Sequence, residues 1–311
     1  MPAKKRNTVI EPVHVKPFLK WAGSKRQLLQ QFINIYPTVL KNGHVRNYYE
    51  PFLGSGAVFF DIAQRYTIEN AFLCDVNEEL ILTYKTVQAR AEKLIEVLYK
   101  HEKKYLSLDT AHRQAYFYDQ RASFNGHRFD SGFTEHNAKG IARAAQLIFL
   151  NRTCFNGLFR VNSKGEFNTP AGDYIKPSIC DENNLLAASK LLARADIRIA
   201  DYNQALKRVR VSAFVYFDPP YRPVSKTASF TAYSKAVFGD KEQRQLCKLF
   251  TRLDKKGTTL MLSNSDCNDA FFDNMYQGFH VMRVPAKRLI NADPSKRGLV
   301  NEIVVTNYPV G

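Results

Sequence analysis

The sequence predicts an α/β fold with a mostly parallel sheet and an inserted, mainly helical segment. Short runs rich in β-forming residues alternate with helical patterns near both ends of the chain, and a glycine turn and a Pro-Pro turn each follow directly on such a run. Between about residues 85 and 180 these runs disappear, and the sequence becomes helical, polar, aromatic and basic. We therefore expect residues 1–84 and 181–311 to form one domain, and residues 85–180 to form a second domain inserted into it.

The expected strands are short apolar runs bounded by turn residues. In chain order they are VRNYYE (45–50), AFLCD (71–75), DIRIAD (196–201), AFVYF (213–217), TTLML (258–262), FHVMRV (279–284) and EIVVTN (302–307). Helical patterns cover AVFFDIAQRY (57–66), a long segment from about Glu78 to Tyr105, and DKEQRQLCKLFTRLD (240–254). Because strands alternate with helices, the strands are expected to run mostly parallel.

The composition is that of a globular protein with an excess of positive charge. Of 311 residues, 45 are Lys or Arg and 29 are Asp or Glu, which gives a formal net charge of +16, and 45% are hydrophobic. These proportions exclude a disordered or fibrous chain. The excess of basic residues favours a polyanionic partner, most simply nucleic acid, and a solvated basic surface without a specific ligand is the alternative.

Other features of the sequence bear on its location. No run approaches the length of about 18 apolar residues that a membrane span needs. The basic N-terminus has no apolar core of a signal peptide, so we do not expect secretion. The five cysteines lie far apart with no CxxC pair, a spacing that disfavours a zinc cluster or a disulfide framework and is typical of a reduced, cytoplasmic protein.

The strongest chemical signal is the tetrapeptide Asp218-Pro219-Pro220-Tyr221, directly after an expected strand. In an open α/β sheet, ligands bind in the crevice beyond the carboxyl ends of strands. Two prolines hold the backbone extended and remove two N–H donors, so nearby carbonyl groups stay free as acceptors. With the Asp218 carboxylate and the Tyr221 ring, the motif matches a planar ring that carries two N–H donors. A Pro-rich turn with an Asp cap is the structural alternative.

A glycine turn, PFLGSG (51–56), follows the first expected strand and begins a helix. Gly54 and Gly56 would allow the backbone to approach a cofactor closely. Asp75 ends the next strand, where an acidic residue is placed to hold ribose hydroxyl groups. The turn is neither a GxGxxG fingerprint nor a P-loop, but together with Asp75 and Asp218 in one sheet it predicts a cofactor site.

With these motifs, the chain resembles the Dam-type adenine-N6 DNA methyltransferases of the D12 class, from Pro17 to Asn307. The order of the motifs, with the glycine turn before the insert and DPPY after it, is that of the alpha group. The family carries an FLKWAGxK segment, here FLKWAGSK (18–25). The resemblance implies a Rossmann-like, S-adenosylmethionine-dependent methyltransferase sheet, and a target-recognition domain at residues 85–180 that carries a β-hairpin.

The resemblance also implies that the cofactor is S-adenosylmethionine and indicates which residues bind it. The methionine part is assigned to the first segment, the ribose to Asp75, and the adenine to the end of the third strand. The cofactor residues are Trp21, Ala22, Gly23, Lys25, Phe52, Gly54, Gly56, Asp75, Asp201, Tyr202 and Asp218.

The chemistry assigned to the DPPY residues follows from the weak nucleophilicity of adenine N6. Hydrogen bonds from the amino group to the Asp218 carboxylate and the Pro219 carbonyl would localise the nitrogen lone pair for attack on the sulfonium methyl group. An ordinary Asp, with a pKa of about 4, is ionised at neutral pH and suits this acceptor role. Tyr221 would stack on a base that has been flipped out of the duplex. The chemistry requires no metal, and the His and Cys positions suggest none.

The insert carries a second motif, NRTCFNGLFR (151–160) followed by GEFNTP (165–170). Taken alone, it could be an ordinary β-hairpin with NSKG as its turn. Arg160 can donate two hydrogen bonds to guanine, Asn156 can read a base edge or a phosphate, and Leu158 can fill a gap in the base stack. The motif resembles the Dam-type hairpin that reads GATC. The resemblance implies DNA contacts from Lys20, Arg152, Asn156, Leu158, Arg160 and Pro170.

Three other segments give weaker signals. Residues 222–240 are polar and too long for a simple connection, which favours either a loop that orders over the flipped base or a plain mobile loop. The basic residues within 283–298 suit phosphate contact or a solvated face, and those at 4–6 suggest a disordered tail.

The prediction is therefore a cytoplasmic, site-specific DNA adenine methyltransferase. Its partner would be double-stranded DNA, with a monomer as the expected form and a restriction endonuclease at the same site as a possible companion. Two alternatives stay open: a methyltransferase that acts on RNA or a protein amide, for which Asn is more usual at position 218, and a DNA-binding protein that has lost catalysis.

Overall fold

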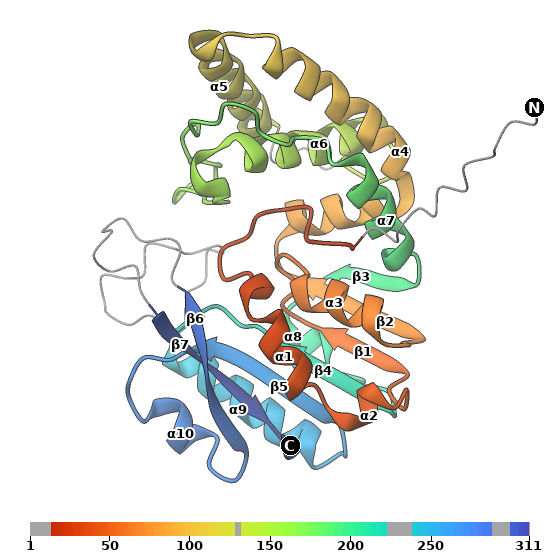
Figure 1. The fold of residues 1–311 in the computed structure, drawn as a ribbon, viewed down its shortest axis with the longest axis vertical. Coiled ribbons are helices and arrows are strands. Elements are labelled where there is room, and N and C mark those ends of the chain that lie inside the picture. Colours follow the sequence, from red (N-terminus) through yellow and green to blue (C-terminus); the bar gives the residue numbers. More distant parts are fainter. Residues whose placement is uncertain (1–13, 128–131, 223–237, 288–298, 311) are drawn as a thin grey trace, which may run out of the picture.

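The computed structural model describes residues 14–127, 132–222, 238–287 and 299–310. In this part of the chain, one seven-stranded sheet is the centre of the molecule (Figure 1), in the order β3-β2-β1-β4-β5-β7-β6. The strands are β1 (Asn47–Glu50), β2 (Asn70–Asp75), β3 (Ala195–Ile199), β4 (Ala213–Phe217), β5 (Thr259–Ser265), β6 (His280–Lys287) and β7 (Leu299–Thr306).

The first five strands are parallel, and the antiparallel strand β7 lies between β5 and β6. The prediction of a mostly parallel α/β sheet is thus confirmed. Every expected strand is present, with ends that differ by a few residues. Strands β5, β6 and β7 extend furthest beyond the expected bounds. Strand β3 instead ends early, at Ile199, because the Asp201 side chain caps the next helix and accepts hydrogen bonds from the backbone N–H groups of Asn203 and Gln204.

Helices cover both faces of the sheet. Two are short 3₁₀ turns, η1 (Lys25–Gln27) and η2 (Phe155–Gly157). The α-helices are α1 (Leu29–Ile35), α2 (Thr38–Lys41), α3 (Ala57–Arg65), α4 (Glu78–Leu106), α5 (Thr110–Gly126), α6 (Ala138–Thr153), α7 (Glu182–Leu192), α8 (Tyr202–Ala205), α9 (Asp240–Asp254) and α10 (Phe271–Met275). None of the helices in the described segments is both long and apolar enough to cross a lipid bilayer.

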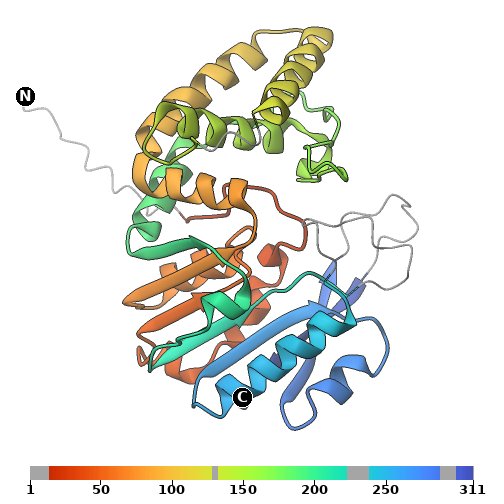
Figure 2. The ribbon, with the colours of Figure 1, turned by 180° about the vertical axis from the view of Figure 1, so that it is seen from behind.

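Alternation along the strands produces two apolar layers. Tyr48 points to the face covered by α1 and α3, whereas Tyr49 points to the face covered by α9, which Figure 2 shows from behind. The same alternation places Tyr216 in the first layer and Phe217 in the second. Both faces of the parallel strands are therefore buried, which explains why these strands are nearly continuous apolar runs in the sequence.

The helices α4, α5 and α6 form a separate layer above the sheet (Figure 1). Helix α4 begins beside the sheet and continues into this layer, with a break in helical geometry at Arg90 (φ −142°, ψ 36°). One continuous apolar core joins the sheet to this layer, and it includes Tyr84 near the start of α4 as well as Phe117 and Phe149. The helical layer therefore packs firmly on the sheet.

The weaker sequence signals fall largely outside the described residues. These are the basic residues at 4–6, the part of the polar connection at 223–237, and the basic positions at 288–298.

Candidate active site

The site lies where the direction of the sheet connections reverses, between the adjacent strands β1 and β4. The chain leaves β1 and β4 toward opposite sides of the sheet, which opens a crevice beyond their carboxyl ends. The glycine turn at residues 51–56 follows β1, and the tetrapeptide at 218–221 follows β4. The fold therefore brings the two strongest sequence motifs to the same edge.

The glycine turn needs glycine at both positions. Gly54 and Gly56 have φ values of 48° and 63°, in the left-handed region that other residues rarely adopt. A Cβ atom at Gly56 would lie 2.7 Å from Tyr84 Oη. The backbone N–H of Gly54 donates to Asp75 Oδ2 at 3.0 Å. The turn is thus a preformed cradle tied to the end of β2.

The Asp75 carboxylate lies between this turn and the start of α4. Its Oδ1 atom accepts a hydrogen bond from the backbone N–H of Asn77 at 3.0 Å. The Asn77 side chain in turn caps α4 by accepting from the backbone N–H of Leu80. Burial raises the pKa of Asp75, although these backbone donors partly oppose the shift.

Aromatic rings line the next part of the edge. Phe52 stacks on Tyr202, with ring centroids 5.4 Å apart and planes at 27°. Phe238 meets Phe52 edge-on at 5.7 Å. Asp201 precedes Tyr202 and caps α8. A flat heteroaromatic ring would find stacking partners here.

The Asp218 carboxylate is paired with a buried lysine. Lys25 Nζ lies 2.5 Å from Asp218 Oδ1, and the lysine side chain is only 1% exposed. The same ammonium group donates to the Gly23 carbonyl at 3.0 Å and to Tyr221 Oη at 3.2 Å. Lys25 was predicted only as a cofactor residue, whereas the structure places its charged end against the DPPY motif.

The environment of Asp218 changes its acidity. Burial raises the pKa of Asp218 to about 6, and the nearby Lys25 charge limits the increase. The prediction of an ordinary pKa was therefore wrong, because the sequence does not reveal how much solvent the carboxyl group loses. Burial opposes the charged form of Lys25, but the adjacent charges, Asp218 foremost, outweigh it and raise the lysine pKa.

Tyr221 and Glu302 complete this cluster. Tyr221 Oη donates to Glu302 Oε1 at 2.6 Å, while 38% of the tyrosine surface is exposed. Glu302 lies on β7, is 7% exposed, and has its Oε2 atom 3.6 Å from Lys25 Nζ. The sequence analysis gave Glu302 no role, and its only signal was a single acid in the apolar run EIVVTN.

Trp21 connects the glycine turn to the loop that follows α6. Its ring stacks on Phe159, with centroids 5.1 Å apart and planes at 15°. A Cβ atom at Gly54 would lie 3.2 Å from Trp21 Cδ1, so the indole also covers the turn. Ala22 and Gly23 follow, and Gly23 has a φ of 76°.

The second motif forms a small hairpin-like loop after α6. Antiparallel bridges pair Cys154 with Ala171 and Val161 with Phe167. Asn156 (φ 56°) and Arg160 are exposed, and Leu158 is half-buried. Arg160 Nε donates to Asn168 Oδ1 at 2.8 Å, while Pro170 is exposed near the other bridge.

Two other predicted DNA-contacting residues, Arg152 and Lys20, also have partners within the protein. The Arg152 guanidinium donates to the Phe18 carbonyl at 2.8 Å and is partly buried, so in this structure it holds the N-terminal segment and does not extend into solvent. Lys20 is exposed and places its ammonium group 3.4 Å from Tyr174 Oη.

Asn151 is a residue whose role the sequence analysis did not identify. Fully buried, it accepts from the backbone N–H of Lys20 at 2.8 Å and donates to the carbonyl groups of Lys20 at 2.8 Å and Gly157 at 3.0 Å. The lack of a side chain at Gly157 is required, since a Cβ atom would lie 2.2 Å from Lys20 Cδ. Asn151 therefore connects the backbone at Lys20 to the hairpin loop at Gly157.

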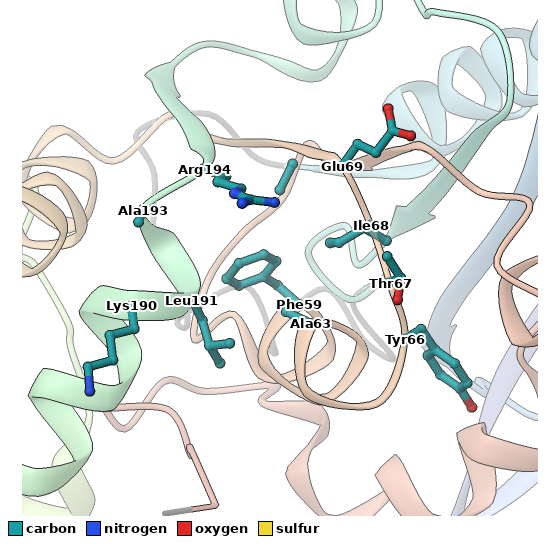
Figure 3. Close-up of a pocket in the computed structure, with 11 residues that line it drawn as sticks. Phe59, Ala63, Tyr66, Thr67, Ile68, Glu69, Lys190, Leu191, Ala193 and Arg194 are labelled. Carbon is teal, nitrogen blue, oxygen red and sulfur yellow. The ribbon is translucent and has the colours of Figure 1, made fainter.

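Two pockets in the described residues lie away from this edge. One, of about 340 Å³, lies between α3 and the end of α7, where Figure 3 shows Phe59 and Leu191 with Arg194 beside them. The other, of about 380 Å³, lies in the helical layer beside His101 and Arg143. Neither includes a predicted site residue. Within the described segments, no group of three or more His, Cys, Asp or Glu side chains is arranged to hold a metal ion.

Comparison with known proteins matches the chain to one family model and to several DNA methyltransferases. The family model of the D12 class N6 adenine-specific DNA methyltransferases matches residues 21–290. The chain is 45% identical over 297 residues to the type II methyltransferase M.MjaIII of Methanocaldococcus jannaschii, covering 95% of this chain and 100% of that protein. It is 37% identical to M1.LlaDCHI of Lactococcus lactis (95% and 96% covered) and 32% identical to a DNA adenine methylase of Haemophilus influenzae (93% and 92% covered).

Proposed function

The chain belongs to the D12 class of N6 adenine-specific DNA methyltransferases, and on that premise we propose that it transfers a methyl group from S-adenosylmethionine to a flipped adenine, within GATC. One observation carries the proposal: Asp218 and Tyr221 lie in the same crevice as the glycine turn, at the reversal point of the sheet. A hydrogen-bond acceptor for the base thus faces a cradle for the cofactor.

The crevice fits S-adenosylmethionine in shape and chemistry. The left-handed glycines at 54 and 56 leave room for close approach to the backbone, Asp75 is placed for ribose hydroxyl groups, and Phe52 with Tyr202 offers a stacking surface for the adenine ring. We assign the methionine part to Trp21, Ala22, Gly23 and Lys25. When bound, the cofactor supplies an electrophilic methyl group.

Asp218 and Pro219 act on the nucleophile. Their carboxylate and carbonyl oxygens accept hydrogen bonds from the two N6–H groups, which localises the nitrogen lone pair and orients it toward the methyl group. The half-exposed ring of Tyr221 stacks on the flipped base. The proton that N6 loses after the transfer passes to Asp218, whose pKa near 6 suits an acceptor at neutral pH.

The helical insert, residues 85–180, is the proposed target-recognition domain, and residues 1–84 and 181–311 are the catalytic domain. We assign base contacts to Asn156, Arg160 and Lys20, whose exposure supports the assignment, and further DNA contacts to Leu158 and Pro170. Because Arg152 is turned inward, its proposed contact to DNA requires the side chain to leave the Phe18 carbonyl.

Family membership and the intact motifs disfavour both alternatives from the sequence analysis, a methyltransferase for RNA or a protein amide and an inactive DNA-binding protein. The family description specifies adenine N6 of DNA, which disfavours RNA or a protein amide as the substrate. The intact Asp218, Gly54 and Asp75 disfavour a protein that only binds DNA. We also propose a monomer that acts in the cytoplasm, alone or beside a restriction endonuclease that cuts the same sequence.

The direct test is to incubate the protein with S-adenosylmethionine and unmethylated DNA, and then to map N6-methyladenine by sequence context. Marks confined to GATC are the expected result. Methylated adenines in another sequence would support the proposed methyl transfer but refute GATC as the recognition sequence. An absence of marks on DNA would refute the proposed function.

A further inference from the structure

Lys25 is at the centre of a cluster that holds more acid than base. An ammonium group has three donors, and here they go to Gly23 O, Asp218 Oδ1 and Tyr221 Oη. The pairing with Asp218 at 2.5 Å is the closest of these contacts. Lys25 thus occupies an oxygen of the carboxylate that, in the proposed mechanism, accepts a hydrogen bond from the adenine amino group.

Glu302 has one oxygen atom that is not hydrogen-bonded. Oε1 accepts from Tyr221, but the buried Oε2 has no hydrogen-bond partner among the described residues. A buried carboxylate oxygen without a donor is costly, and the cost is removed if a donor can reach it. Lys25 Nζ lies 3.6 Å from Oε2, just beyond hydrogen-bond distance.

The fold keeps Glu302 in this position. Strand β7 pairs with β5 on one side and β6 on the other, with Glu302 opposite Ser265 and Val284. Strand β5 in turn pairs with β4, directly before Asp218. Glu302 is thus held by two ladders, whereas the flexible lysine stem can carry its ammonium group across a short distance.

We propose that Glu302 is a positioning residue: its Oε2 atom takes up the Lys25 ammonium when the adenine amino group reaches Asp218, while its Oε1 atom holds Tyr221 for stacking. This inference rests on the proposed function and extends it. The exchange moves no covalent bond. It frees Asp218 Oδ1 to accept a hydrogen bond from the base without leaving the lysine charge unpaired.

The other groups around Asp218 are consistent with this assignment. Glu50 on β1 is buried and accepts a hydrogen bond from Tyr48 Oη at 2.6 Å. Among the described residues, Lys25 pairs with Asp218 and Glu302 and not with Glu50. Ser263 on β5 reaches Asp218 Oδ1 only at 3.5 Å. Glu302 is therefore the second carboxylate that Lys25 can reach in this cluster.

The test compares Glu302→Gln with the wild-type protein in single-turnover methylation across pH. The amide keeps the size of the side chain and removes its charge. We expect a rate at least tenfold lower at neutral pH. We also expect the acid limb of the pH profile to move to lower pH, because the Glu302 charge raises the pKa of Asp218. Glu96→Gln on the exposed face of α4 is the matched control for net charge and should behave as wild type.

A structural role alone would lower the thermal midpoint and the active fraction but leave the acid limb in place, and that result overturns the proposal. An unchanged rate also overturns it. If Glu302→Gln does not fold, Glu302→Asp keeps the charge and withdraws it by one methylene group. A lower single-turnover rate per active molecule, with the wild-type acid limb, supports the proposal. A wild-type rate per active molecule refutes it. Failure of the wild-type protein to methylate DNA would instead refute the proposed function.

Discussion

The catalytic crevice and the hairpin loop use similar side chains in opposite environments. In the crevice, Lys25, Asp218 and Glu302 are largely withdrawn from water and pair with one another. In the hairpin loop, Asn156 and Arg160 are exposed. Groups of the first kind are preorganised before any ligand arrives, whereas on the proposed function groups of the second kind are expected to gain their main partners when DNA binds.

We therefore expect the crevice to control the rate of methyl transfer and the loop to control its sequence specificity. Substitutions in the crevice should change how fast a methyl group is transferred, and substitutions in the loop should change where it is placed. Trp21 and Asn151 lie between the two regions, because one stacks on Phe159 and the other hydrogen-bonds both Lys20 and Gly157. Four predictions test how far the separation holds.

The largest effect is expected for Asp218→Ala. Removing the acceptor for N6 should lower the single-turnover rate by about 10²–10⁴-fold while DNA affinity stays nearly unchanged. Asp196→Ala, at a half-buried position on β3 away from the crevice, is the control. Filter binding and methyl transfer measured on the same duplex separate the two quantities, and robust turnover by Asp218→Ala would contradict the mechanism.

Asn151→Ala should affect both regions, because it removes the connection between them. The buried backbone groups of Lys20 and Gly157 would lose their partner, which should lower the free energy of unfolding by about 3 kcal/mol. Urea denaturation measures this change, with Asn203→Ala on the exposed turn of α8 as the control. If Asn151→Ala and Asn203→Ala had the same free energy of unfolding, the hydrogen bonds of Asn151 would not contribute to stability.

Arg160→Ala should change specificity and leave catalysis intact. We expect a loss of about 1–3 kcal/mol of discrimination at one base pair, with a normal rate on the best substrate. Methylation of a set of single-substituted GATC duplexes measures this loss. Arg152→Ala, which alters an inward-facing arginine, should instead lower stability. If Arg160→Ala lowered stability and Arg152→Ala changed specificity, Arg152 would be the base-reading residue and Arg160 the structural one.

The pH dependence should be the smallest effect, and it comes from the crevice alone. Since Asp218 must be ionised to accept from N6 and its pKa is near 6, the transfer rate should be full above that pH and fall as pH decreases through it. At one pH unit below the pKa, the rate should be about tenfold lower. Single-turnover rates from pH 5 to 8 test this, and a midpoint near pH 4 would indicate an ordinary carboxyl group.

Much of the crevice could be predicted from the sequence because its parts are local. Parallel strands buried on both faces are apolar runs, and the motifs at residues 51–56 and 218–221 directly follow two of them. Strand β7 was expected as a strand, but its place between β5 and β6 has no local signal. For the same reason the contact between Lys25 and Glu302 and the raised pKa of Asp218 could not be predicted, since both depend on packing between distant segments.

The position of β7 also makes the lysine cluster depend on segments that are far apart in the chain, because Lys25, Asp218 and Glu302 come from three separate parts of it. In the described sheet, strand β7 is joined to the parallel strands only through its antiparallel pairing with β5. Local unfolding of β6 and β7 would therefore withdraw Glu302 while the parallel strands still held the glycine turn and the DPPY residues. We expect partial opening of this edge of the sheet to disturb the lysine cluster before the rest of the sheet unfolds.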